Sequence, residues 1–360
     1  PYDAAPNASH ADVSGFCYQE ANHQGPAYGS ICPWFWVCDA GYHWHDSDHS
    51  CWNDTHHEPP VDPRNLGDQP CTLGNPVNVG TGNKFQAETD YTGQGALPLE
   101  FRRYYNSAAP GLDTLGAGWT HSYSATISAS LNRAYARRSD GKILTYTLNG
   151  GVATAAADVT EKLHRLADPQ GHLAGWRLTS ADDTVEVYDM GGRLVSLADR
   201  EGRTVTLAYN ALWQLSQVTD PTGRMLTLTY YTTGTSKALL QSVTAPGSTV
   251  FTYQYDGARN LQSVAFSAPG VPSTTRTYLY NDPAHTQGAN LPHALTGIRD
   301  ENDVGGTPFA TFRYDTTGRA IGTEHAGGAG SYSFTYNANG ETIATDPAGT
   351  ARTYAFQTQF

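Results

Sequence analysis

Apolar and polar residues alternate along much of the chain between residues 188 and 356. At Val205, Leu207 and Tyr209 every second residue is large and apolar, with threonine or alanine in between. Three further stretches have the same pattern: 226–230, 251–255 and 332–336. Because successive side chains of a strand point to opposite faces, the alternation predicts strands with one apolar and one hydroxyl-bearing face. Such strands are typical of a half-buried antiparallel sheet.

Tetrapeptides that start with Asp or Asn and end with Gly separate these stretches. They occur at residues 168–171, 189–192, 199–202, 220–223, 315–318, 337–340 and 346–349. These residue types favour those turn positions, and the proline second in three of the tetrapeptides has the φ angle of a type I turn. In the regular stretches, turns start 9 to 11 residues apart, which leaves strands of roughly six residues. We therefore expect the chain to reverse direction at each turn.

Tyrosines, most of them followed by Asp or Asn, mark a longer period. They are Tyr188, Tyr209, Tyr230, Tyr255, Tyr280, Tyr314 and Tyr336, at intervals of 21, 21, 25, 25, 34 and 22 residues. The longer intervals indicate longer loops, and Phe356 takes the tyrosine position in the last copy. Residues 161–168 have the best helical spacing in the chain but are too few for a stable helix. The repeats therefore predict an all-β antiparallel ribbon, in which each copy buries its neighbour's apolar face.

This combination resembles the RHS and YD-repeat family. The repeat motif is Tyr188-Asp189 with Gly192-Arg193-Leu194. Upstream, three segments resemble the conserved domain that precedes the repeats in bacterial RHS proteins: 74–91, 97–107 and 115–124. The resemblance covers residues 74–360. It implies a long β-ribbon that winds into a hollow shell, often around a toxic C-terminal domain. The copies around Tyr255 and Tyr280 lack the Gly-Arg pair, and no self-cleaving segment or variable toxin is visible.

Composition divides the chain into four parts. Residues 1–58 are rich in Cys and Trp and have no regular periodicity, which is typical of a small module held together by disulfides. Residues 59–75 are dense in Pro, Gly and Asp and are expected to be a linker. We assign residues 76–150 to the β-rich domain that precedes the repeats and residues 151–360 to the repeats.

The charge of the chain argues against nucleic acid as a partner. The formal net charge is −12, and the few Lys and Arg residues form no run or stripe. The chain contains no run of 18 apolar residues, so we expect no membrane span. It starts with neither Met nor a basic and then apolar leader, as a mature secreted chain would.

Five cysteines lie within the first 71 residues, and the remainder of the chain has none. Their clustering predicts disulfides among Cys17, Cys32, Cys38 and Cys51, with three possible pairings, while Cys71 is either free or linked elsewhere. Because disulfides persist in oxidising compartments, we expect the protein to be secreted or located at the cell surface. The Cys38 to Cys51 segment also resembles the closing half of an EGF-like loop. That resemblance implies a Cys38–Cys51 bond, with Cys17 and Cys32 as the second pair.

Four tryptophans of the N-terminal module are candidate binding residues: Trp34, Trp36, Trp44 and Trp52. They could form a stacking surface for sugars or for another protein, although at least two are expected to form the core of so small a module. Nearby histidines and aspartates, at positions 43–57, match no zinc pattern, so we assign no metal site.

Other candidate residues favour structural roles. The Asp-Pro pairs at 168, 220 and 346 invite comparison with the self-cleavage of the resembled family, but their position in the repeats identifies them as turns. Trp119 and His121 are expected to pack in a core. Four arginines follow turn glycines and are expected to pair with turn carboxylates across neighbouring strands: Arg193, Arg203, Arg224 and Arg319.

No common catalytic motif occurs in the sequence, so we expect neither enzymatic activity nor a cofactor. The leading hypothesis is a non-catalytic structural segment that forms part of a shell around, or displays, a C-terminal toxin-like domain. A strand at the end of such a ribbon exposes unpaired backbone groups. We therefore expect downstream polypeptide beyond Phe360, or another subunit, at this edge. The alternative is an extracellular adhesin that binds surface glycans through the Trp-rich module.

Overall fold

The computed structural model describes residues 65–109, 111–130, 132–149, 151–301 and 306–356, and the backbone of four strands nearer the N-terminus. The chain divides into two units, Pro1–Asp62 and Pro63–Phe360. The strands of the first unit are β1 (Ala8–His10), β2 (Trp36–Cys38), β3 (Tyr42–His45) and β4 (Ser50–Asn53). They pair antiparallel as β1–β2 and β3–β4. The side chains of this unit, and with them the four predicted disulfide cysteines, lie outside the described residues.

The second unit starts with a set of small sheets that we call the plug, residues 65–155. Its strands are β5 (Thr72–Leu73), β6 (Val77–Asn78), β7 (Phe85–Thr92), β8 (Glu100–Asn106), β9 (Leu112–Asp113), β10 (Gly116–Ala117), β11 (Trp119–His121), β12 (Thr126–Ala129), β13 (Arg133–Arg137), β14 (Ile143–Asn149) and β15 (Val152–Ala155). The two larger sheets have the strand orders β11-β8-β7 and β12-β13-β14-β15.

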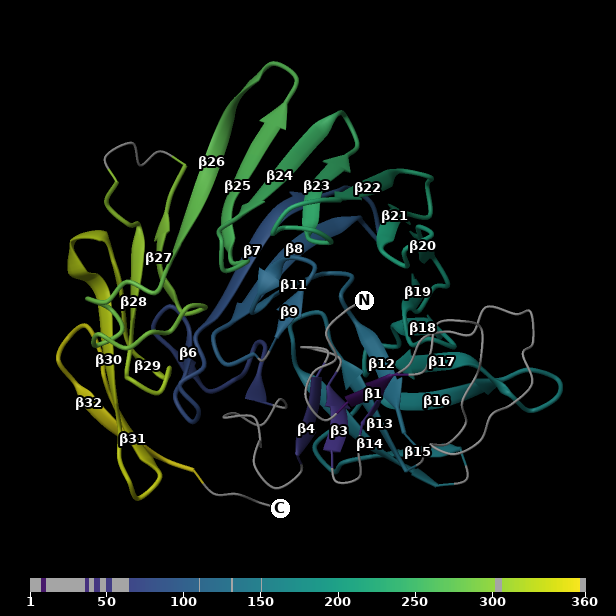
Figure 1. The fold of residues 1–360 in the computed structure, drawn as a ribbon, viewed down its shortest axis with the longest axis horizontal. Coiled ribbons are helices and arrows are strands. Elements are labelled where there is room, and N and C mark those ends of the chain that lie inside the picture. The colour runs from purple at the N-terminus through teal and green to yellow at the C-terminus, as the bar shows by residue number, and fades with distance from the viewer. Residues whose placement is uncertain are drawn as a thin grey trace. The chain divides into compact units, whose positions relative to one another are not determined.

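The remainder of the second unit is one 17-stranded sheet, the long sheet, in which every strand pairs with its neighbours in sequence (Figure 1). Its first strands are β16 (Lys162–Ala167), β17 (Leu173–Thr179), β18 (Val185–Asp189), β19 (Leu194–Ala198), β20 (Thr204–Tyr209), β21 (Leu215–Thr219), β22 (Met225–Tyr230), β23 (Leu240–Ala245) and β24 (Thr249–Tyr255). The others are β25 (Leu261–Ala268), β26 (Val271–Tyr280), β27 (Leu295–Arg299), β28 (Ala310–Tyr314), β29 (Ala320–His325), β30 (Ala329–Tyr336), β31 (Glu341–Thr345) and β32 (Ala351–Ala355).

These observations confirm the prediction of an all-β fold with a long antiparallel sheet. The described residues contain no α-helix, and a 3-10 turn lies at Ala326–Gly328. Alternation sets the two faces as predicted, because Val205 and Leu207 are buried whereas Thr206 and Ala208 are exposed. The buried face of the long sheet is called the inner face below.

The predicted turns all form, and one pattern of hydrogen bonds explains why. At 220–223, the Asp220 carbonyl accepts the N–H of Gly223, and its Oδ1 accepts the N–H groups of Thr222 and Arg224. The last position of such a turn has a positive φ, 86° at Gly223, which glycine adopts without steric cost. Bonds from glycine to the first residue of the turn recur in the other six tetrapeptides.

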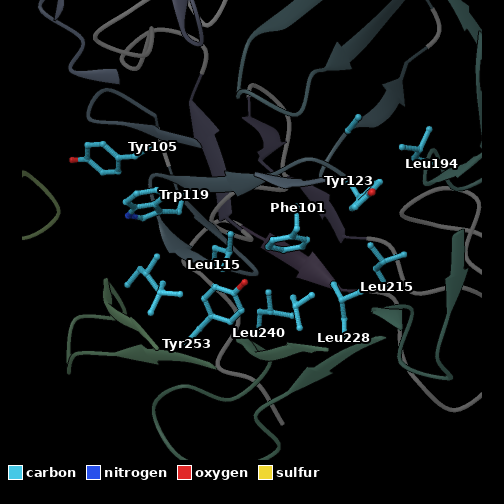
Figure 2. Packing of buried hydrophobic residues seen from close by; sticks show 14 of the residues in the cluster. Phe101, Tyr105, Leu115, Trp119, Tyr123, Leu194, Leu215, Leu228, Leu240 and Tyr253 are labelled. Carbon is cyan, nitrogen blue, oxygen red and sulfur yellow. The ribbon is translucent and has the colours of Figure 1, made fainter. Parts of the chain in front are cut away.

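The core lies between the plug and the inner face of the long sheet. Buried residues of both form one hydrophobic cluster. Figure 2 shows Phe101, Leu115 and Trp119 of the plug close to Leu240 and Tyr253 of the long sheet. The rings of Phe101 and Tyr253 are 6.2 Å apart between centroids. The apolar face of the sheet is therefore covered by residues far upstream in the sequence.

Candidate functional site

The most regular feature of the long sheet is a series of tyrosine hydrogen bonds, which we call the tyrosine ladder. Each hydroxyl donates to a backbone carbonyl of the preceding repeat at 2.7 to 3.0 Å. The donor and acceptor pairs are Tyr209–Leu194, Tyr230–Leu215, Tyr255–Leu240, Tyr280–Leu261, Tyr314–Leu295 and Tyr336–Ala320. The repeated tyrosines therefore link consecutive copies in addition to the strand pairing.

A β-bulge fixes the position of each acceptor. The register shifts where Tyr209 pairs with Leu215, and the same shift occurs at Tyr188, Tyr230, Tyr255, Tyr280 and Tyr314. In every case the residue opposite the tyrosine is the acceptor for the tyrosine of the next copy. Bulges increase local twist, so a bulge in each repeat re-aims the backbone at regular intervals.

The plug binds some of these bulge residues through their backbone N–H groups. Leu240 donates to the carbonyl of Thr114 at 2.7 Å, and Ala320 donates to the carbonyl of Gly82 at 2.8 Å. Leu295 donates to the hydroxyl of Tyr105 at 2.9 Å. Each of these residues thus bonds the plug through its N–H and the next tyrosine through its carbonyl.

Buried charges also join the plug to the inner face. Arg103 of β8 makes a bidentate ion pair with Asp90 of β7, with Nε–Oδ2 at 2.8 Å and Nη2–Oδ1 at 2.9 Å. Its Nη1 donates to the Tyr278 hydroxyl at 2.9 Å, and the Tyr253 hydroxyl donates to Asp90 at 2.7 Å. Burial raises the pKa of both tyrosines, so both hydroxyls remain protonated.

Lys84 is a second buried cation of the plug. Its Nζ donates to the carbonyl of Phe85 and to Gln86 Oε1, and it lies 4.3 Å from the centroid of the Phe312 ring. Burial lowers the pKa of its ammonium group.

Sequence reasoning did not identify Arg103, although a signal for it was available. In β8 the alternation places Arg103 on the same face as Phe101 and Tyr105, both of which are buried. A charged residue in an apolar register needs a buried partner. That partner, Asp90, could not be chosen from the sequence because acidic residues are numerous.

Trp119 and His121 lie in the core, as expected. Trp119 is fully buried and donates from Nε1 to the Tyr280 hydroxyl at 2.8 Å. The His121 ring stacks on Phe101 with centroids 5.1 Å apart, and its Nδ1 accepts the backbone N–H of Tyr123. Burial lowers the pKa of the imidazole to about 4, so the ring is neutral at neutral pH.

The four turn arginines pair with carboxylates, but in their own turns rather than across neighbouring strands. In each case Nε donates to the aspartate four residues earlier, at 2.6 to 2.8 Å: Arg193–Asp189, Arg203–Asp199, Arg224–Asp220 and Arg319–Asp315. The turn places the arginine that follows the glycine next to the aspartate at the first turn position. Each arginine therefore pairs with the aspartate of its own turn. Arg224 makes a contact outside its own turn as well, because it also donates to the carbonyl of Gln94 in the plug.

At the C-terminal end of the described residues, β32 pairs with β31 on one edge and with no strand on the other. Its side chains are mostly exposed. Phe356 follows β32 at the ladder position and has no hydroxyl to donate. The bulge is also missing from the last copy, where Tyr336 pairs with Thr342 without a register shift. We call the unpaired side of β32 the terminal edge; its backbone N–H and C=O groups pair with no other strand of the described sheet.

The remaining predicted site residues are only partly described. The side chains of Trp34, Trp36, Trp44 and Trp52 lie outside the described residues, so their binding role stays a prediction. Cys71 is an exposed free thiol. Among the described residues, no group of three or more His, Cys, Asp or Glu could hold a metal ion. None of the helices in these residues has the length and hydropathy of a membrane span.

Comparison with known proteins agrees with this architecture. A model described as a domain of unknown function, DUF6531, matches residues 74–146, and the RHS repeat model matches residues 188–225. The double-stranded DNA deaminase toxin A of Burkholderia cenocepacia (strain H111) is 25% identical over 293 residues, which is 71% of this chain and 19% of that protein. This chain therefore spans about a fifth of the length of that relative.

Solved structures with partial similarity include TcdB2-TccC3, at 14% identity and a TM-score of 0.30 over 77% of this chain and 15% of that chain. Another is the N-terminal domain of the effector protein SpvB from Salmonella typhimurium strain LT2, at 12% identity and a TM-score of 0.21 over 75% of this chain and 100% of that chain.

Proposed function

Because this chain belongs to the RHS/YD-repeat family, we propose that it is a non-catalytic structural segment of a secreted, toxin-associated protein. Its role is to form part of a β-shell that encloses or displays a C-terminal domain. The observation that carries this proposal is the continuous antiparallel sheet of β16–β32, joined copy to copy by the tyrosine ladder. A sheet built from repeats can be extended without a new core, since each copy contacts mainly its neighbours.

The position of the plug supports a containing role. Plug residues are bonded to the inner face at widely separated repeats, from Gly192, which accepts the N–H of Ile127, to Ala320, which donates to Gly82. A wall held at several points resists local opening better than a free sheet, because opening must break all of these contacts together. The partial similarity to a deaminase toxin is consistent with a toxin as the contained domain.

The terminal edge at β32 is where the shell would continue. We propose that downstream polypeptide of the same protein, or another subunit, adds a strand there, since unpaired backbone groups at a sheet edge favour strand addition. The comparisons do not favour the glycan-binding alternative.

Hydrogen exchange of the β32 amides tests this proposal. In the 360-residue chain the outward amides of β32 should exchange fast, whereas in the natural full-length product they should be protected as strongly as those of β31. Equal, fast exchange in both proteins would show that nothing pairs with β32. Mass spectrometry of the natural product supplies the second check, because a single species that ends at Phe360 and stays monomeric contradicts the proposal.

Limited proteolysis of the full-length product tests containment. The segment downstream of residue 360 should resist cleavage until denaturant opens the sheet, and then be cut in the same transition that exposes the ladder tyrosines. Cleavage of that segment at unchanged rate in the native protein argues for display rather than enclosure. Turnover of any substrate by the 360-residue chain itself would contradict the non-catalytic role.

A further inference from the structure

Three side chains with complementary chemistry follow one another at the start of β7 in the plug. Lys84, Gln86 and Glu88 occupy alternate positions, so they project from the same face of the strand. The Nζ of Lys84 donates to Oε1 of Gln86 at 2.8 Å, and Nε2 of Gln86 donates to Oε1 of Glu88 at 2.9 Å. An amine, a carboxamide and a carboxylate are therefore joined by hydrogen bonds in that order.

The direction of the Gln86 amide follows from its two neighbours. The carboxylate of Glu88 pairs with Arg276 through Oε2, and as an acceptor it takes the amide N–H of Gln86 on Oε1. The carbonyl oxygen of the amide consequently faces Lys84. The electrophilic carbon of Gln86, Cδ, thus lies one bond from the atom that the amine contacts, and the amide nitrogen lies next to a base.

The surroundings of Lys84 favour the neutral amine, which is the nucleophilic form of the side chain. Lys84 is 0% exposed, and its Nζ lies 4.3 Å from the centroid of the Phe312 ring. Burial lowers the pKa of the ammonium group, although the charge of Glu88 acts in the opposite direction. Buried lysines serve as nucleophiles in proteins for this reason. The lack of access to water also removes the competing nucleophile.

We propose that Lys84 and Gln86 form an intramolecular isopeptide bond in the folded chain, with Glu88 as the general base. The Nζ–Cδ bond forms and the Cδ–Nε2 bond breaks. Glu88 takes the proton that Nζ loses and returns it to Nε2, which leaves as ammonia. One amide replaces another, so the step needs no oxidant, cofactor or second substrate. It occurs once in each chain, and it replaces a buried ionisable amine by a neutral amide.

Tryptic peptide mapping of the denatured 360-residue chain tests the proposal. Lys84 is the one internal trypsin site in residues 65–102. Trypsin does not cut after an acylated lysine, so the parent chain should yield residues 65–102 as one uncut peptide. This peptide should be lighter than its sequence by the mass of one ammonia molecule. Residues 65–102 contain no Asn-Gly pair, which excludes the common succinimide as the source of the loss. A synthetic peptide of the same residues, which has never folded, should be cut after Lys84.

Two variants test the roles of the other side chains. Glu88→Gln removes the base, and Gln86→Met removes the carbonyl that the amine attacks. Both variants should be cut after Lys84 and show no loss of ammonia. Glu201→Gln is the matched control for Glu88→Gln, because it removes the same charge from a turn where the side chain is 62% exposed. It should retain the uncut peptide.

Cleavage of the parent chain after Lys84, or an uncut and lighter peptide from Glu88→Gln, would overturn the proposal. Mapping of the parent chain by itself decides whether the bond exists, so the test does not depend on the folding of any variant. None of these results changes the hydrogen exchange expected at β32. The shell and the isopeptide bond can therefore fail separately.

Discussion

At the residue scale, the stability of the second unit depends on a few polar groups in an otherwise apolar core. The ion pair of Asp90 and Arg103 is almost fully removed from water, with side-chain exposures of 5% and 3%. Neither charge is tolerable alone, because an unpaired buried ion has lost its hydration without compensation. The pair, together with the hydroxyls of Tyr253 and Tyr278, fixes how β7 and β8 lie on the sheet.

Replacing Asp90 by Asn should therefore lower the free energy of unfolding by about 3 to 5 kcal/mol, since it leaves the Arg103 guanidinium buried without a counter-charge. Urea denaturation measures the loss. The double variant Asp90→Leu with Arg103→Met should recover much of it. Asp182→Asn, at an exposed position, is the control. If Asp90→Asn lowers the free energy of unfolding no more than Asp182→Asn does, the ion pair does not contribute to stability.

His121 predicts a pH dependence. Its pKa is about 4 in the folded state against an ordinary value of 6.5, so between these values the unfolded chain binds the extra proton. The contribution to stability is complete above about pH 6.5 and is lost as the pH falls towards 4, up to about 3 kcal/mol. His121→Gln should remove this part of the slope in urea denaturations at pH 7 and pH 5. An unchanged slope in the variant would assign the acid sensitivity to other groups.

At the scale of single elements, the repeat combines a bulge, a turn and a tyrosine. Each has a local cause in the sequence, but they act together because the bulge residue opposite one tyrosine accepts the hydroxyl of the next. The ladder explains why tyrosine recurs at this position when phenylalanine would bury as much apolar surface. Residues 161–168 illustrate the opposite case: their helical spacing is overridden, and residues 162–167 form strand β16.

Tyr230→Phe tests the ladder. It removes one hydroxyl and leaves the carbonyl of Leu215 without its partner, so we expect a loss of about 1 to 2 kcal/mol in chemical denaturation. Tyr354→Phe is the matched control, because the Tyr354 hydroxyl makes no hydrogen bond with the described residues, and it should cost much less. Equal effects of the two substitutions would argue that the ladder bonds add nothing.

The turn glycines separate backbone strain from tertiary contact. Gly223 has a φ of 86° and open space around it, so Gly223→Ala should cost about 1 to 2 kcal/mol from the left-handed conformation alone. At Gly192, with a φ of 76°, a Cβ would also lie 1.7 Å from the carbonyl oxygen of Ile127 in the plug. Gly192→Ala should therefore cost clearly more in the same denaturation assay, and it should loosen β12, seen as faster exchange of the Ile127 amide.

At the scale of the whole second unit, the plug covers the inner face and the tyrosines join the copies, so many hydroxyls are buried in one cooperative structure. Burial raises the pKa of the ladder tyrosines, for example Tyr255, Tyr280 and Tyr314. The unfolded chain releases these protons at about pH 10, whereas the folded chain retains them.

Above pH 10 the unfolded state therefore binds fewer protons, and stability must fall as the pH rises further. We expect the protein to unfold in a single transition as the pH is raised. The increase in tyrosinate absorbance and the decrease of the sheet signal in circular dichroism should occur over the same pH range. Tyrosinate formation that is complete well before the sheet signal changes would show that the ladder hydroxyls are accessible in the folded protein.

The sequence by itself determined the local structure of this protein. Alternation fixes which side chains of residues 204–209 face the core, and Asp or Asn with glycine fixes the turns, because both effects act within a few residues. The tertiary structure alone decided what covers the inner face, which carboxylate pairs with Arg103, and that the tyrosine hydroxyls bond to the preceding repeat. These contacts join residues far apart in the sequence, 175 positions in the case of Arg103 and Tyr278. Such pairings depend on how whole sheets pack together, and no local pattern specifies them.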